Sequence, residues 1–231
     1  MRKLFAFTLA ETLIVMGIIG VVAALTLPNL NSSTGDKEKV AKVKKIYSNL
    51  EDAYGRATAI YGPVENWADN NGDVSAQKYG ERFTEFMRVS KSCGNGEGCF
   101  SKNGDMGGLG DNSSYYKYIL SDGTSIAFDY GYPYGYIWID IDGPNKGSAE
   151  IGKDIFQFYI SQGNQKGQLF PWGGDTDTFS GEDDCPKSKV EGCTAWIIKH
   201  GNMDYLKTDS SGKCKNNTSI VLDGVSNITC K

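Results

Sequence analysis

The six cysteines are the residues with the clearest chemistry, and they fall in three close pairs: Cys93 with Cys99, Cys185 with Cys193, and Cys214 with Cys230. An even number of closely paired cysteines is typical of disulfides formed in an oxidising compartment. Zinc ligation is the alternative, but no C-x-x-C motif occurs and the only histidine, His200, stands apart. We therefore expect three local disulfides, although the sequence alone leaves their connectivity open.

A second group of polar side chains can bind a cation. Asp140, Asp142, Asn145 and Asp154 lie within "DIDGPNKGSAEIGKD", and carboxylate and amide oxygens suit calcium, a hard cation. The EF-hand pattern is not met, because Ile151 occupies the position of the closing glutamate. Structural calcium at these four residues is one interpretation, and a metal-free turn rich in Asp and Asn is the favoured one.

Little in the chain indicates catalysis. His200 lies at the end of a predicted strand, and no nucleophile elbow or phosphate-binding loop is present. The net charge of −4 argues against nucleic acid as a bulk partner. We expect a protein that is not an enzyme and that needs no cofactor beyond the calcium considered above.

The N-terminal segment is the most distinctive part of the sequence. Phe7 to Leu27 gives 21 residues in which Glu11 is the only charge, which is long enough for a helix that crosses a bilayer. A secretory signal peptide is the alternative, since Arg2 and Lys3 form a basic start and small residues follow late in the run. The length of the run and the acid within it favour the membrane helix, in which a buried carboxylate requires a specific cation.

The stretch "FAFTLAETLIVMGIIGVVAALTLP" resembles the N-terminal segment of type IV prepilins and type II secretion pseudopilins. The resemblance implies that a prepilin peptidase removes a leader of residues 1–6 by cutting between Ala6 and Phe7, and then methylates the new amino terminus of Phe7. Ala6 stands where the family usually has glycine. Glu11 becomes the fifth residue of the mature chain and can pair with the Phe7 ammonium of a neighbouring subunit. Such a buried pair is better suited to setting the register of a filament than to adding net stability.

The rest of the helix is expected in two parts. Residues 7–28 form a transmembrane and assembly helix, in which Gly17 and Gly20 allow close packing and Pro28 ends or kinks the helix. Residues 29–62 form its amphipathic half, which begins with a polar interruption and continues as a helix over about 36–61, closed by Gly62-Pro63. The apolar positions of this half recur at helical spacing: Val40, Val43, Tyr47, Leu50, Tyr54, Ala57 and Tyr61. The lysines near its start face solvent in the favoured interpretation, with anionic lipid or acidic neighbours as the alternative.

Residues 63–231 are expected to form a globular head rich in β-strands. Strands are predicted at about 116–121 and 124–130 around an Asp122-Gly123 turn, at "YGYIWIDIDG", at 194–199 and at "SIVLDG". Alternation predicts that one aromatic row shares a sheet face that packs on the long helix, with an exposed adhesive patch as the alternative: Tyr130, Tyr132, Tyr134, Tyr136 and Trp138. The tracts "DIDGPNKGSAEIGKDIF" and "CTAWIIKHGNMDYLK" resemble ones in pseudopilins and related prepilin-like proteins. Cys214 and Cys230 would close the C-terminal loop, as a C-terminal disulfide does in many pilins.

The sequence therefore predicts an α+β fold: a long N-terminal helix, half transmembrane and half amphipathic, packed on an antiparallel sheet with loops held by disulfides. The resemblance implies a filament subunit, anchored by a single pass in the inner membrane with a periplasmic head, that then enters a periplasmic pseudopilus or a surface filament. Its partners would be further copies, other pilins or pseudopilins, the prepilin peptidase, the assembly platform and lipid. Two alternatives stay open: a minor tip pilin for adhesion or DNA uptake, and a periplasmic binding domain that is anchored but does not polymerise.

Overall fold

The computed structural model describes residues 9–67, 75–102, 114–131, 134–146, 149–161, 167–172, 185, 193–208, 220–222 and 228–230. The chain divides into two compact units, residues 1–38 and 39–231. The helix α1 (Leu9–Tyr61) contributes its first part to one unit and its second part to the other. The observed class is α+β, as predicted, with a six-stranded antiparallel sheet in the second unit.

Helix α1 continues through Pro28, so of the two predicted effects of this proline the end of the helix is wrong and the kink stays a prediction. The 53 residues of α1 include Pro28 and Gly35, so the helix neither ends at the proline nor pauses in the polar stretch after it. A proline removes one backbone donor and strains the turn before it, but the other hydrogen bonds of a long helix remain available. The predicted end is confirmed: Tyr61 is the last helical residue, and Gly62 follows with a φ of 74° and donates its N–H to the Thr58 carbonyl.

The six strands of the sheet follow one another along the chain. They are β1 (Val89–Gly94), β2 (Tyr116–Leu120), β3 (Ser125–Gly131), β4 (Tyr134–Asp140), β5 (Ile155–Ser161) and β6 (Gln168–Pro171), and each pairs antiparallel with the next. The predicted hairpin is confirmed: β2 and β3 meet at the Asp122-Gly123 turn, where Gly123 has a φ of 89°. A hairpin turn of this kind requires a left-handed residue, and glycine adopts that conformation without steric cost.

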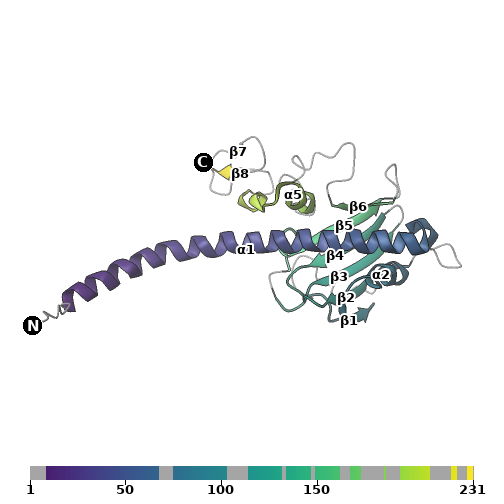
Figure 1. The fold of residues 1–231 in the computed structure, drawn as a ribbon, viewed down its shortest axis with the longest axis horizontal. Coiled ribbons are helices and arrows are strands. Elements are labelled where there is room, and N and C mark those ends of the chain that lie inside the picture. Colours follow the sequence, from purple (N-terminus) through teal and green to yellow (C-terminus); the bar gives the residue numbers. More distant parts are fainter. Residues whose placement is uncertain are drawn as a thin grey trace, which may run out of the picture. The chain divides into compact units, whose positions relative to one another are not determined.

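One face of the sheet packs against the second half of α1, which crosses it in Figure 1. Val43, Leu50 and Ala57 are fully buried, as their spacing predicted, and Ile46 and Ala53 are buried beside them. The Tyr47 ring stacks on Phe158 of β5 with centroids 5.6 Å apart. The amphipathic half of the helix is therefore the main support of the inner face of the sheet.

A compact aromatic layer fills the end of this inner face beyond α1. It joins the 3-10 helix η1 (Val64–Trp67) and the helix α2 (Ala76–Thr84), whose Tyr79 and Phe83 are fully buried. Tyr79 lies over Gly135 of β4, where an added Cβ would stand 2.7 Å from its ring. Glycine at this position lets the tyrosine ring approach the sheet backbone.

The predicted aromatic row does not share one face of the sheet. Strands β3 and β4 pair Tyr130 with Gly135 and Asp129 with Tyr136, so Tyr130 lies on the inner face and Tyr136 on the outer one. Trp138 packs in a second, smaller core on the outer face with Ala127 and Phe100. One uninterrupted strand would place all these residues on one face, but β3 and β4 are separate strands and their register reverses the alternation at the connection. Tyr132 lies outside the described residues.

The tract predicted as a strand at 194–199 is instead the helix α5 (Cys193–His200). Its run of buried residues, Cys193 to Ile197, has no clear period, and such a run does not distinguish a strand from a buried helix. Gly201 closes α5 with a φ of 70° and an N–H bond to the Ile197 carbonyl. The 3-10 helix η3 (Asp204–Lys207) follows directly.

Two of the three predicted disulfides are confirmed, Cys93–Cys99 and Cys185–Cys193. Cys214 lies outside the described residues, so its pairing with Cys230 stays a prediction. The predicted last strand is present as β7 (Ile220–Leu222), which pairs antiparallel with β8 (Ile228–Cys230).

Candidate functional site

The first section of α1 presents apolar side chains on every side of the helix. Leu13, Ile14, Val15 and Met16 follow one another and are 64%, 63%, 53% and 73% exposed. Successive helical residues are separated by about 100°, so four of them cover the whole circumference. A helix that is apolar all round requires an apolar environment, such as lipid or packed protein.

Glu11 lies in the first turn of α1, and its side chain is exposed within this apolar section. The predicted processing residues Ala6 and Phe7 lie outside the described residues. Gly17 and Gly20 are open, because an added Cβ at either would meet no described atom within 4 Å. The pairing of Glu11 with the Phe7 amine of a neighbour therefore stays a prediction.

Over the described residues, no helix combines the length and the apolarity that a membrane crossing requires.

Ion pairs of three lysines join the second section of α1 to loops at one end of the sheet. Lys39, Lys42 and Lys45 occur three residues apart and so lie on one face of the helix. Lys45 Nζ lies 3.0 Å from Asp122 Oδ2, and Lys42 Nζ lies 3.4 Å from Asp142 Oδ1. These three lysines therefore contact acidic residues of their own head, whereas the favoured interpretation of the sequence had them facing solvent.

The ion pair at Lys39 is the least exposed of the three. Lys39 Nζ contacts Asp154 Oδ1 and lies 4.0 Å from Asp142 Oδ2. The Asp154 side chain is 1% exposed, whereas that of Asp122 is 35% exposed. A carboxylate with so little access to water depends on its ammonium partner much more than an exposed one does.

Asp140 is the buried member of this acidic cluster. Its Oδ1 accepts hydrogen bonds from the backbone N–H groups of Asp142 and Gly143, each at 3.1 Å. Its Oδ2 has no hydrogen-bond partner among the described residues, and the same holds for Ser125 Oγ on the facing strand. Burial and the nearby carboxylates of Asp154 and Asp142 raise the pKa of Asp140 to about 7, although the two backbone hydrogen bonds oppose this shift.

The turn that carries Asp122 and the turn that carries Asp142 touch each other. Gly143, with a φ of 77°, lies so close to the Asp122-Gly123 turn that an added Cβ would stand 2.4 Å from the Gly123 carbonyl oxygen. Only glycine combines this left-handed conformation with such a close approach.

The structure brings together three of the four predicted calcium ligands, Asp140, Asp142 and Asp154, whereas Asn145 is exposed. The ammonium groups of Lys39 and Lys42 already lie against two of these carboxylates. Within the described part of the chain, no three His, Cys, Asp or Glu side chains are arranged to hold a metal ion. The described geometry fits lysine counter-ions better than calcium, and calcium, the less favoured interpretation of the sequence, stays untested.

Comparisons with protein-family models, with curated proteins and with solved structures find no match to this chain.

Proposed function

We propose that this chain is a prepilin-like structural subunit of a type IV pilus or a type II secretion pseudopilus, polymerised through its N-terminal helix. The observation that supports the proposal is the first section of α1, which exposes apolar side chains around its whole circumference. The same helix continues into the section that packs on the sheet of the head. A subunit built in this way has one half of its helix committed to its own core and the other half available to lipid or to other subunits.

In this proposal, residues 7–28 anchor the subunit in the inner membrane by a single pass, and the head lies in the periplasm. After cleavage between Ala6 and Phe7, the helix leaves the lipid and packs among the helices of neighbouring subunits. Glu11 then accepts the Phe7 ammonium of a neighbour. A misplaced subunit would leave both charges unpaired in an apolar environment, and removing even one partner of a comparable buried pair costs about 3–5 kcal/mol.

The assembly role is tested with Glu11→Ala and a control on the same helix, Glu51→Ala, whose side chain is exposed. Filaments are sheared from cells producing each variant, after the amount of mature, membrane-bound subunit has been shown to be equal. We expect filaments to be lost with Glu11→Ala and kept with Glu51→Ala. Normal yield with Glu11→Ala would contradict the assembly role and favour a head domain that is anchored but not polymerised.

The processing step is tested by the intact mass and N-terminal sequence of protein from its native host. We expect a chain that begins at Phe7 with a methylated amine. A start at Met1, or near Ala24 as for an ordinary signal peptide, would contradict the pilin proposal. Imaging of labelled subunits along or at the end of the filament then separates a major subunit from a tip pilin.

A further inference from the structure

Helix α5 interrupts the pairing of β5 with β6. The two strands pair Ile160 with Leu169 and Phe158 with Pro171, so the next rung of the ladder would join Gln157 and Trp172. In an antiparallel ladder, such a hydrogen-bonded pair exchanges two bonds, one in each direction. Only one of them is present here: the Trp172 N–H donates to the Gln157 carbonyl at 2.9 Å.

The first turn of α5 supplies the missing partners. The Gln157 N–H donates to Thr194 Oγ1 at 3.1 Å, and the Trp172 carbonyl accepts the N–H of Ala195, also at 3.1 Å. Thr194 and Ala195 therefore stand between two backbone groups that could otherwise bond to each other. The Gln157 N–H and the Trp172 carbonyl each have a partner in either arrangement, whereas the Ala195 N–H has its Trp172 partner only in the inserted one.

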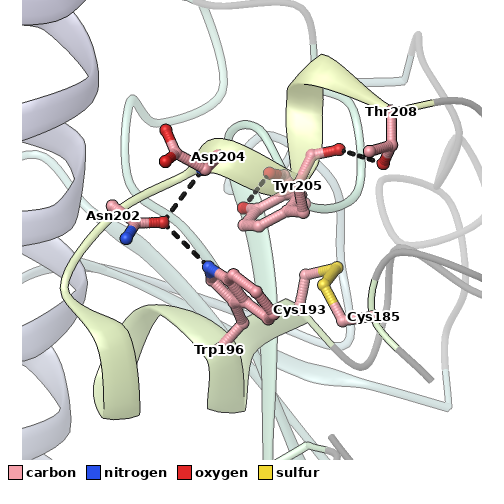
Figure 2. Close-up of a disulfide and its surroundings, with 8 residues drawn as sticks. Cys185, Cys193, Trp196, Asn202, Asp204, Tyr205 and Thr208 are labelled. Carbon is pink, nitrogen blue, oxygen red and sulfur yellow. Dashed lines mark hydrogen bonds between the residues drawn. A yellow bond between two sulfur atoms is a disulfide. The ribbon is translucent and has the colours of Figure 1, made fainter. Parts of the chain in front are cut away.

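A disulfide fixes the chain at the residue before this insertion. Cys193 precedes Thr194 and is bonded to Cys185, and both cysteines are at most 1% exposed. Figure 2 shows this disulfide beside the segment that follows α5, where Asn202 accepts a hydrogen bond from Trp196 Nε1 at 2.8 Å. The Tyr205 hydroxyl also donates to the Gly152 carbonyl. The segment after α5 thus has contacts of its own, and the first turn of α5 has the disulfide in addition to its hydrogen bonds with Gln157 and Trp172.

We propose that the Cys185–Cys193 disulfide is a latch that keeps the first turn of α5 inserted in the sheet, and that without it Gln157 and Trp172 close the rung between them. The head then has two arrangements, one with Thr194 and Ala195 inserted and one with the β5–β6 ladder extended by a rung. The proposal is independent of filament assembly, because it concerns only the head.

The experiment measures amide hydrogen exchange at single-residue resolution in the full chain in detergent micelles. Four proteins are compared: the oxidised parent, Thr194→Val, Cys185→Ala/Cys193→Ala, and the combination of all three substitutions. Cys93→Ala/Cys99→Ala is the control for loss of a disulfide elsewhere in the head. Thr194→Ser, which keeps the hydroxyl, is the control for the change at Thr194.

In the oxidised protein, Thr194→Val removes the acceptor of the Gln157 N–H, so we expect exchange at Gln157 to rise by about tenfold or more. Thr194→Ser should leave it unchanged. In Cys185→Ala/Cys193→Ala, exchange should rise at Ala195 while Gln157 stays protected by the Trp172 carbonyl. Adding Thr194→Val to that background should then have no effect on Gln157.

Two results would overturn the latch. One is an equal rise at Gln157 from Thr194→Val with and without the disulfide, which would mean that the rung does not close. The other is loss of protection throughout β3, β4 and β5 in Cys185→Ala/Cys193→Ala but not in Cys93→Ala/Cys99→Ala. That outcome would make the disulfide a requirement for the fold.

Discussion

The two sections of α1 place their apolar side chains in opposite environments. Over Leu9 to Val22 the apolar side chains are exposed, and between Val40 and Ala57 most of them are buried against the sheet. The second section satisfies the need to remove apolar surface from water within its own chain. The first section leaves its apolar side chains exposed, so one continuous helix carries a surface used for folding and, in the function proposed above, a surface for lipid or other subunits.

The largest expected effect comes from equal substitutions in the two sections. Leu50→Ala leaves a cavity at a fully buried position and should lower the free energy of unfolding of the head by about 3–5 kcal/mol. Leu13→Ala, at a position 64% exposed, should change it by less than about 0.5 kcal/mol. Denaturant unfolding of each full-length variant in micelles, followed by near-UV circular dichroism, measures both. Equal effects would mean that the two sections do not differ as described.

The next effect concerns pH and the buried Asp140. Its pKa rises from the ordinary value of 3.8 to about 7 in the folded chain, so the folded state retains a proton that the unfolded state releases. The free energy of unfolding should therefore fall as pH rises from about 4 to 7, by up to about 4 kcal/mol, and the loss should be complete above that range. In Asp140→Asn this part of the pH dependence should disappear. A variant whose pH profile parallels that of the parent would show that Asp140 is ionised in both states.

A smaller effect on stability is expected from the lysine ion pairs, and it should differ between Lys39 and Lys45. Lys39→Met leaves the buried Asp154 without its ammonium partner and should cost about 1–3 kcal/mol, because Lys39 itself is partly exposed. Lys45→Met removes a more exposed pair with Asp122 and should cost less than about 0.5 kcal/mol. Thermal melts of both variants at low and high salt measure the difference. A cost at Lys45 that equals the one at Lys39 would contradict the burial argument.

The smallest effect is expected from calcium. Because Lys39 and Lys42 already oppose the acidic cluster, replacing EDTA with millimolar calcium should move the melting temperature of the parent by less than about 1 °C. Asp142→Asn serves as the comparison. A clear rise in the parent that is absent in this variant would establish the calcium site predicted from the sequence.

The sequence predicted the parts of the fold that depend on local periodicity. The spacing of Val43, Leu50 and Ala57 located the buried face of α1, and Asp122-Gly123 located a hairpin. The errors arose where a tertiary choice overrode a local signal. Pro28 lies inside a continuous helix because the other backbone hydrogen bonds of α1 still form, and the apolar run from Thr194, which has no clear period, formed a helix beside β5 instead of a strand.

The acidic cluster shows a different limit of sequence analysis. Asp140, Asp142 and Asp154 were recognised as a group because they lie close together in the chain. Their lysine partners come from about a hundred residues earlier, with Lys42 and Asp142 a hundred positions apart. The three-residue spacing of the lysines shows that they share a helix face, but it does not show which loops that face meets. Nothing in the sequence indicated that Ser125 belongs to this cluster, because only the pairing of β3 with β4 places it opposite Asp140.

Gly143 packs directly on the Gly123 carbonyl, so the two Asp-Gly turns are in close backbone contact. One turn carries Asp122 and the other Asp142, so the acids that meet Lys45 and Lys42 lie on backbones in direct contact with each other. Replacing one turn with a longer loop would therefore displace the other turn and disturb the ion pairs of Lys42 and Lys45 together. Transferring this arrangement to another protein would require both turns and the section of α1 that they face.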